Sequence, residues 1–294
     1  MYLTIKYLFK SSSLAQYIFF VPLMLRTALL RFKYRNAFAA LSRFAESCNE
    51  DVVVHVPEFS GNFKISPKSN LFQRCMIYGS YEPDISRVFF ENIDLEKDVI
   101  DVGANVGFYS IGSALRLKSG RVLAIEPTTG AYSKLLENIR INNLTDKVLP
   151  VKYIISDQPG LIQLNTLHGN EEYSSIGDFS HGAVLGKLAV IEEVQAVTLD
   201  SLVQKYNLRP AIIKIDVEGA EFKVLLGATE TLRKYHPCIM MECSDVMLKQ
   251  QKSSSQEILD FLKEIGYIVI NPSAPKVSVR HPVDGDLFAY YMHQ

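Results

Sequence analysis

The stretch that decides the fold is Val99-Ile-Asp-Val-Gly-Ala-Asn-Val-Gly-Phe-Tyr-Ser110, an apolar strand that leads through a turn of small residues into a helix. Gly103 and Gly107 allow the backbone to approach a ligand closely, and Asn105 tolerates the left-handed conformation that such turns often need. The spacing is not GxGxxG, and Asp101 precedes the turn. A pyrophosphate would meet a carboxylate there, so the stretch favours a nucleotide-like cofactor with a cationic, amine-bearing end.

Length and composition predict one large core together with a distinct N-terminal segment. The chain has 294 residues, of which 48% are hydrophobic, and its formal net charge is −1. This balance argues against a protein built around nucleic-acid phosphates, so no nucleic-acid partner is expected. Residues 1–47 nevertheless hold seven basic residues against one acidic residue, a local net charge of +6.

Residues 14–30 (LAQYIFFVPLMLRTALL) are apolar but are interrupted by Pro22 and Arg26. They fall short of the roughly 20 clean residues that a spanning helix needs. A signal peptide is not expected, because basic residues lie on both sides and no small-residue cleavage site follows. Two interpretations stay open: a helical pair packed on the main domain, and peripheral membrane contact through residues 1–47 with anionic lipids.

Cysteine usage is typical of a reducing compartment. The four cysteines show neither CxxC spacing nor the density of a disulfide-stapled domain: Cys48, Cys75, Cys238 and Cys243. We expect reduced, mostly buried thiols and no zinc site. A cytoplasmic location follows, with membrane association through the N-terminal segment left open.

The chain is expected to divide into three regions. These are a basic and apolar helical segment (1–50), a β-hairpin with a lead-in helix (51–97) and the main domain (98–294). In the second region, VVVHVPEFSGNFKI predicts two strands around a turn near Ser60-Gly61-Asn62. Pro83 is expected to begin a helix that runs to Glu91.

Strand and helix patterns alternate through the main domain. Strands are expected at 98–102, 121–126, 148–155, 211–217, 237–243, 267–270 and 287–292, with helices near 107–117, 129–142, 199–206, 218–235 and 254–265. Alternation of this kind predicts a doubly wound, mainly parallel sheet covered by helices on both faces. Residues 157–195 are rich in Gly, Ser, Asn and His and break the rhythm, so a long functional loop is expected there.

Acidic residues fall at the carboxyl ends of the expected strands, where ligands of doubly wound sheets bind. Glu126 follows Gly107 by nineteen residues and is expected to take both ribose hydroxyls by bidentate hydrogen bonding. An acidic residue before a helix is also an ordinary cap, and for Asp157 the two interpretations are equally open. These acidic residues at strand ends also include Glu242, and together they indicate a ligand site more specifically than any one of them does.

A second cluster lies in Ile212-Ile-Lys-Ile-Asp-Val-Glu-Gly-Ala-Glu-Phe222. Lys214 stands in the middle of an apolar strand and needs a partner or a path to water. Asp216 and Glu218 follow it into a turn, while Glu221 suits the first turn of a helix. The spacing does not define a divalent-cation site, so no metal is expected.

The order of these motifs resembles the FkbM-type methyltransferases over about residues 78–270. The shared motifs are Tyr81-Glu-Pro83, VIDVGANVGFYS, AIEP (124–127), LLENIRINNL (135–144), SDQPG (156–160), VTLDSL (197–202), IIKIDVEGAEFKVLLGA (212–228) and MMEC (240–243). The resemblance implies S-adenosyl-L-methionine as cofactor. It also implies a seven-stranded Rossmann-like methyltransferase sheet whose last strand is antiparallel, and methyl transfer, commonly to a hydroxyl of a sugar or natural product.

The resemblance also implies roles for individual residues on the cofactor side. Asp101 and the backbone from Gly103 through Asn105 to Gly107 would hold the methionine end, with Ser110 near its carboxylate at the helix N-terminus. Glu126 would bind ribose, Ser156 and Asp157 would face the adenine, and Tyr81 and Glu82 would close over the site.

A hydroxyl acceptor is a poor nucleophile until its proton leaves, so a base is expected. Asp216 and Glu218 are the first candidates, because their strand should end beside the methyl group. His168 and His181 in the long insertion are second. The insertion also holds Asn170, Tyr173, Ser174 and Ser175, which suit hydrogen bonding to a polyol.

The sequence therefore predicts a methyltransferase acting on oxygen of a small-molecule or glycan acceptor. Two alternatives remain. A nicotinamide-dependent oxidoreductase could use the same sheet, but it predicts a GxGxxG turn that the chain lacks. A non-catalytic membrane-surface adaptor predicts broken cofactor residues, whereas Asp101, Glu126 and Asp216 are all present.

Overall fold

The computed structural model of the chain describes residues 43–48, 50–166, 190–279 and 285–292. The chain falls into two units, Met1–Asn49 and Glu50–Gln294. In the first unit, residues 43–47 are helical. The apolar stretch at 14–30 and the insertion residues from His168 to His181 lie outside the described residues.

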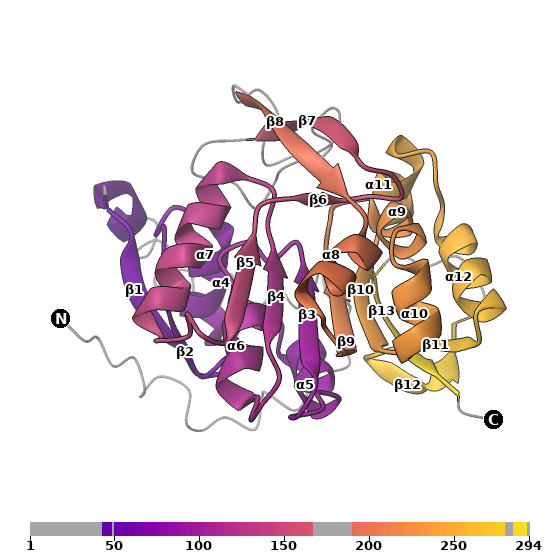
Figure 1. Cartoon of the computed structure of the whole chain (residues 1–294). Helices are drawn as coiled ribbons and strands as arrows, with labels where there is room; N and C mark the ends of the chain where they lie inside the picture. The colour runs from indigo at the N-terminus through magenta and orange to yellow at the C-terminus, as the bar shows by residue number, and fades with distance from the viewer. Residues whose placement is uncertain (1–42, 49, 167–189, 280–284, 293–294) are drawn as a thin grey trace. The chain divides into compact units, whose positions relative to one another are not determined.

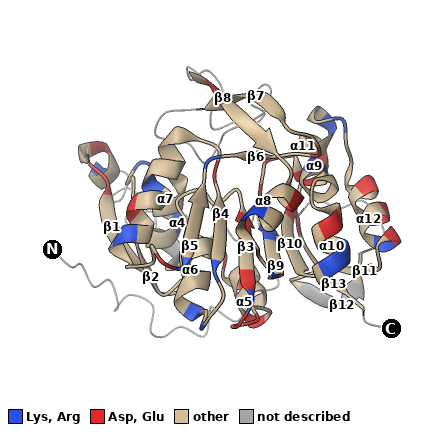
Figure 2. Cartoon of the chain, viewed as in Figure 1, with Lys and Arg blue, Asp and Glu red and all other residues tan. Residues whose placement is uncertain are grey.

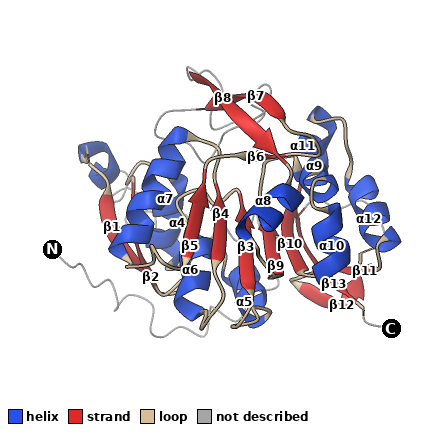
Figure 3. Cartoon of the chain, viewed as in Figure 1, coloured by secondary structure: helices blue, strands red, loops and turns tan. Residues whose placement is uncertain are grey.

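An eight-stranded sheet forms the centre of the second unit, in the order β12-β11-β13-β10-β9-β3-β4-β5 (Figures 1 and 3). The strands are β3 (Asp98–Val102), β4 (Val122–Ile125), β5 (Val148–Val151), β9 (Pro210–Ile215), β10 (Cys238–Cys243), β11 (Tyr267–Asn271), β12 (Ala274–Ser278) and β13 (Gly285–Tyr291). Strand β13 is antiparallel to both β10 and β11, whereas β5, β4, β3, β9 and β10 are mutually parallel.

Seven of these strands have the expected methyltransferase arrangement, with the last strand antiparallel. The eighth, β12, was not expected and pairs with β11 at the edge. Its sequence APKVS carries a proline and no alternation, which is tolerated at a sheet edge but gives no strand signal.

Helices cover both faces of the sheet (Figure 1). The helices are α4 (Asn70–Tyr78), α5 (Pro83–Glu91), α6 (Phe108–Arg116), α7 (Thr129–Ile141), α8 (Leu199–Tyr206), α9 (Glu221–Leu226), α10 (Thr229–Tyr235), α11 (Asp245–Gln250) and α12 (Ser255–Glu264). Helices α10 and α12 each carry residues of both charge signs (Figure 2).

The core on one face joins α8, α9, α10 and α12 to inward residues of the strands such as Ile100 and Ile213. Helix α6 contacts β3, β4 and β5. Because strand side chains alternate, Asp101 and Lys214 point away from the residues of that core, toward α6. The two residues are also register partners in β3 and β9, so the fold sets an acidic and a basic side chain next to each other.

The N-terminal hairpin consists of β1 (Val52–Val56) and β2 (Gly61–Ile65), but its turn is 57–60 rather than the expected Ser60-Gly61-Asn62. Ser60 takes the left-handed conformation, with φ 58°. Gly61 is a strand residue that pairs with Val56. A Cβ on Gly61 would lie 2.9 Å from the Ile111 side chain, so this glycine permits close packing against α6.

The long loop expected at 157–195 is in part a hairpin. Strands β6 (Ile154–Ile155), β7 (Gly160–Thr166) and β8 (Val190–Val197) form a separate sheet in the order β6-β8-β7. The expected strand 148–155 therefore breaks after Val151, and its end joins this second sheet. Figure 1 places β7 and β8 beyond the carboxyl ends of the central strands, and Leu164, Val194 and Ala196 form their buried face.

The expected helix at 218–235 is also divided, into α9 and α10, with Gly227 between them. A Cβ on Gly227 would lie 2.2 Å from the Ser156 carbonyl oxygen. The break therefore lets the chain after β6 pass close to the helix. Helices α4 and α11 were not expected at all.

Candidate active site

A cavity opens at the carboxyl ends of the central strands. Part of its lining comes from the turn after β3, from Glu126 and Pro127, and from Tyr153, Ile154, Ile155 and Leu164 of the second sheet and its approach. The lining also includes Tyr81, Tyr109, Lys214, Asp216, Glu218 and Glu242. Segments far apart in the sequence thus share one cavity, and it includes many of the positions singled out in the sequence.

The turn after β3 has the left-handed conformations that its residue types predict. Gly103, Asn105 and Gly107 have φ values of 82°, 51° and 94°. The nearest obstacle to a side chain at Gly103 is another turn of the protein, because a Cβ there would lie 1.8 Å from the Asp216 carbonyl oxygen. This glycine therefore lets the turns after β3 and β9 touch through their backbones.

Asp101 is buried and only half satisfied. Its Oδ2 accepts a hydrogen bond from the Ser110 hydroxyl at 2.6 Å, while Oδ1 has no partner. Burial raises the pKa of Asp101, although Lys214 and Ser110 lower it. Ser110 does not line the cavity; in this structure its hydroxyl is committed to Asp101.

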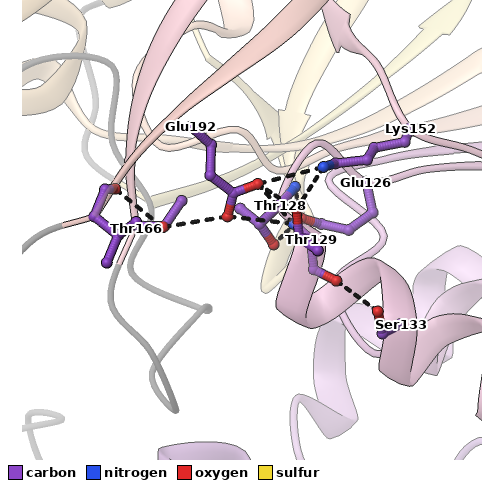
Figure 4. Close-up of polar contacts among 8 residues, drawn as sticks. Glu126, Thr128, Thr129, Ser133, Lys152, Thr166 and Glu192 are labelled. Atoms are coloured by element: carbon purple, nitrogen blue, oxygen red, sulfur yellow. Dashed lines mark hydrogen bonds and ion pairs between the residues drawn. The ribbon is translucent and has the colours of Figure 1, made fainter.

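Glu126 is held at both carboxylate oxygens, and Figure 4 shows it beside Thr128, which holds one of them. Its Oε1 accepts from the Thr128 amide at 2.9 Å and hydroxyl at 2.7 Å, and its Oε2 accepts from the Asn105 amide at 2.9 Å. A carboxylate offers about four acceptor positions, so one remains at Oε2. Burial raises the pKa of Glu126 to about 7, against the lowering effect of these hydrogen bonds.

Tyr81 and Glu82 are held in place by a carboxylate that the sequence did not single out. Glu58, in the hairpin turn, accepts from the Tyr81 amide at 2.8 Å, the Glu82 amide at 3.2 Å and the Ser86 hydroxyl. The Glu82 carboxylate accepts from the Tyr109 hydroxyl at 3.1 Å. Tyr81 lines the cavity and Glu82 lies behind Tyr109, so the hairpin fixes this wall.

Lys214 supplies positive charge to an acidic site. Its Nζ donates to Asp216 Oδ2 at 2.7 Å and lies 4.6 Å from the centre of the Tyr109 ring. Burial lowers the pKa of Lys214, but the surrounding carboxylates, led by Asp216 and Asp101, outweigh burial and leave it above its usual value. The Asp216 carboxylate is the partner that a lysine in an apolar strand requires.

Glu218 and Glu242 also line the cavity, and they differ from Asp216 in their partners. Within the described residues, neither carboxylate has a hydrogen-bond or ion-pair partner. Burial, together with the Asp216 carboxylate, raises the pKa of Glu218 to about 8 and that of Glu242 to about 7. Glu218 has φ 54°, an uncommon conformation for a residue with a side chain.

The remaining sequence candidates lie elsewhere. Ser156 is buried and donates to Asp157 at 3.0 Å, and neither residue lines the cavity. Glu221 begins α9 and accepts from the Gly219 amide, as a helix-start residue does. His168 and His181 lie outside the described residues. In the described part of the chain, no three His, Cys, Asp or Glu side chains are grouped to hold a metal ion.

Sequence reasoning missed Tyr109 and Glu58. Tyr109 could have been found, because it stands next to Ser110 in the first turn of a helix expected to face the site. Glu58 gave no local signal, since its partners are 23 to 28 residues away.

The strand order and the cavity at the strand carboxyl ends define a Rossmann-like methyltransferase fold. The family model described as "Methyltransferase FkbM domain" matches residues 101–269. The chain belongs to the FkbM methyltransferase family.

Two curated relatives are similar to this chain. Hexuronic acid methyltransferase AglP of Haloferax volcanii is 23% identical over 187 residues, which cover 62% of this chain and 70% of that protein. Methyltransferase sdnD of Sordaria araneosa is 26% identical over 164 residues, covering 47% and 63%. The chain therefore spans less than two thirds of the second relative.

Solved structures with a similar fold include an FkbM methyltransferase from Methylobacillus flagellatus, with a TM-score of 0.44 and 16% identity. The match covers 67% of this chain and 44% of that chain. M. jannaschii TYW2, solved in complex with AdoMet, matches with a TM-score of 0.40 and 14% identity, covering 83% and 86%.

In the part of the chain that the structure describes, no helix has both the length and the apolar character needed to cross a membrane.

Proposed function

We propose that this methyltransferase transfers the methyl group of S-adenosyl-L-methionine to a hydroxyl oxygen of a sugar, glycan or other hydroxylated metabolite. One observation carries the proposal. A single cavity is lined both by the Gly103–Asn105 turn with Glu126 and by Lys214, Asp216 and Glu218. A cofactor cradle and a group of acid–base residues thus share one space.

The lining around Asp101 and Glu126 fits an aminoacyl nucleoside. The unpartnered Oδ1 of buried Asp101 suits a cationic amine, which would relieve the cost of burying the carboxylate. The open acceptor position at Glu126 Oε2 suits a ribose hydroxyl, one rather than the two expected from the sequence. Tyr153, Ile154 and Leu164 offer the apolar surface that an adenine needs. These three residues take the place that Ser156 and Asp157 had in our expectation.

The cofactor, when bound, supplies a methyl group already activated on a sulfonium, so alignment and proton removal are left to the protein. Glu218 is the general base in this proposal. It is unpaired, it lines the cavity, and its pKa of about 8 lies close to neutral pH. It would take the proton of the acceptor hydroxyl.

Asp216 then has a different part from the one first expected. Its ion pair with Lys214 occupies one oxygen and fixes the carboxylate. We propose that the pair orients the acceptor and provides local charge. The sequence alone could not separate Asp216 from Glu218, because the difference lies in which of them Lys214 reaches.

A hydroxylated acceptor is supported by two carboxylates of the cavity lining. Glu218 and Glu242 are unpaired acceptors, which suit the donor hydroxyls of a polyol. The name of the relative AglP, a hexuronic acid methyltransferase, also supports a sugar acceptor. Both lines concern the class of acceptor and leave its identity to experiment.

The test is methyl transfer from labelled S-adenosylmethionine to a panel of neutral hexosides, amino sugars, hexuronates and small-molecule extracts. We expect label in a hydroxylated product, with Glu126→Ala weakening cofactor binding strongly and Asp216→Asn largely sparing it. Label found only on nitrogen or carbon acceptors would contradict O-methylation. The adaptor alternative predicts no transfer to any acceptor and no cofactor binding.

We propose a cytoplasmic location for this protein, without membrane contact through residues 1–47. None of the four cysteines forms a disulfide, which supports a reducing compartment. Peripheral membrane contact is the alternative, supported by the local net charge of +6. Sedimentation with anionic vesicles, comparing the full chain with a chain that starts at Glu50, separates the two: only the alternative predicts that the full chain alone pellets.

A further inference from the structure

Helix α7 begins beside the cavity without a cap from its own sequence. Thr128 is its N-cap residue and has extended backbone angles, φ −81° and ψ 139°, but its side chain makes no capping hydrogen bond. The hydroxyl instead donates to Glu126 Oε1 at 2.7 Å. The residue that would normally satisfy the helix N-terminus is thus committed to the carboxylate proposed to bind ribose.

Glu192 of β8 supplies the missing cap from outside the helix (Figure 4). Its Oε2 accepts from the Thr129 amide at 3.1 Å and also from the Thr129 hydroxyl. A carboxylate is favoured at this position by the helix dipole. Burial opposes ionisation of Glu192, but the hydrogen bonds from Thr129 and Lys152 outweigh it, and its pKa lies below the usual value.

The same carboxylate contacts two further segments. Lys152 Nζ lies 3.3 Å from Oε2, and the Thr166 hydroxyl lies 3.3 Å from Oε1. Lys152 stands where β5 ends and the second sheet begins, and Thr166 belongs to β7. Glu192 therefore joins three parts of the fold through one side chain.

Each of these three parts continues into the lining of the cavity. Thr129 follows Thr128, which holds Glu126. Lys152 precedes Tyr153, and Thr166 is two residues from Leu164; Glu126, Tyr153 and Leu164 all line the cavity. A displacement of Glu192 would consequently shift both the Glu126 carboxylate and the apolar wall that Tyr153 and Leu164 form.

We propose that Glu192 is a positioning residue for the ribonucleoside part of the cofactor, acting through Thr128 and Glu126 and through the wall formed by Tyr153 and Leu164. The inference rests on the proposed function. Nothing in the sequence points to Glu192, because its partners lie 26 to 63 residues away along the chain.

Strand β8 contains a matched control. Glu193 follows Glu192 directly, but its side chain points to the opposite face and is exposed. Replacing Glu193 removes the same charge from the same strand and breaks no side-chain hydrogen bond or ion pair in the described part of the chain. Any difference between the two positions then reports the contacts and not the net charge.

The experiment is calorimetric titration of the full-length protein with S-adenosylhomocysteine, for wild type and for Glu192→Ala, Glu192→Gln and Glu193→Ala. We expect Glu192→Ala to raise the Kd about tenfold, the size of one lost charged hydrogen bond, and Glu193→Ala to leave it within about twofold. Glu192→Gln keeps the shape and one acceptor, so an intermediate Kd is expected. If the alanine variant fails to fold, the Kd of Glu192→Gln still tests the proposal.

A double-mutant cycle separates positioning from a purely structural role. If Glu192 acts through Glu126, then Glu192→Ala adds little to the Kd of Glu126→Gln, whereas independent effects would multiply. A Kd for Glu192→Ala equal to wild type, with only the melting temperature lowered, would overturn the inference. If the effects of the two substitutions on the Kd multiply, Glu192 does not act through Glu126. Failure of the wild type to bind S-adenosylhomocysteine would refute the proposed function, and this inference with it.

Discussion

At the scale of single residues, Gly103 has a reason to be glycine besides the close approach of a ligand that its motif predicts. The residue lines the cavity, as the motif predicts. Its lack of a side chain is also required by the protein itself, because φ is +82° and a Cβ would lie 1.8 Å from the Asp216 carbonyl oxygen. The sequence contains both turns but not their contact, since only the pairing of β3 with β9 brings them together.

Gly103→Ala is expected to destabilise the fold by about 2–4 kcal/mol, because a backbone oxygen cannot move aside as a side-chain tip can. Gly160→Ala is the matched control, since no atom lies within 4 Å of its Cβ position and its φ is not in the left-handed region. Urea unfolding of both variants measures the difference. Equal stabilities would show that the two turns do not touch as described.

Glu218 leads to a prediction about pH. Burial raises its pKa to about 8, and a general base acts in its ionised form, so the rate should rise with pH through about 8. Glu218→Gln should lower kcat by about 10²-fold or more and remove this limb, with cofactor Kd nearly unchanged. Glu230→Gln, at an exposed position of α10, is the control. A variant at Glu218 that keeps the pH limb would assign the base to another residue.

At the scale of elements, two helices that each follow a cavity-lining segment begin in the same way. Neither α5 nor α7 is capped by the side chain of its own N-cap residue. A carboxylate from a β-hairpin holds each helix start instead: Glu58 contacts Glu82 at the start of α5 and Ser86 within it, and Glu192 contacts Thr129. Both hairpins thereby set the position of a cavity wall.

Glu58→Gln tests this device at α5. The carboxylate accepts from the amides of Tyr81 and Glu82 and from the Ser86 hydroxyl, and an amide nitrogen cannot accept. We expect a loss of about 1–3 kcal/mol in the free energy of unfolding and faster amide exchange at residues 81–86. Glu91→Gln, which loses only an exposed ion pair with Arg87, should change neither. Unchanged exchange in the Glu58 variant would contradict the role given to the hairpin.

The central elements could be predicted because their signals are local. Apolar runs such as 98–102, a glycine turn and the following amphipathic helix each follow from the sequence near them. The end of the strand expected at 148–155, the hairpin β7–β8 and the contacts of Glu58 and Glu192 could not be predicted. Each depends on a partner more than twenty residues away, and the period-two alternation of 162–166 is obscured by Leu161, which is apolar but exposed.

At the scale of the whole molecule, acidic and basic residues are nearly equal in number, but the charged residues that line the cavity are mainly acidic. Burial raises the pKa of Glu126, Glu221 and Glu242 to about 7, that of Glu218 to about 8, and that of Asp286 to about 6. The folded chain therefore keeps protons that the unfolded chain has released. Such a surplus of bound protons makes stability depend on pH.

The ligand-free protein should accordingly lose stability as pH rises from about 5 to 8. Over this window the folded state binds more protons than the unfolded state, so the free energy of unfolding falls with rising pH. Asp245 and Glu192 have lowered pKa values, and their contribution is lost only at more acidic pH. Thermal unfolding at fixed ionic strength measures the trend. A melting temperature that rises steadily between pH 5 and 8 would show that these carboxylates are not buried as described.

Calorimetric titration of the full-length protein with S-adenosylmethionine and with NADH tests whether the cavity holds S-adenosylmethionine. We expect saturable binding of S-adenosylmethionine with a stoichiometry of about one, strong weakening by Glu126→Ala, and no binding of NADH. Binding of NADH without binding of S-adenosylmethionine would refute a methyl-donor site and would favour the oxidoreductase alternative.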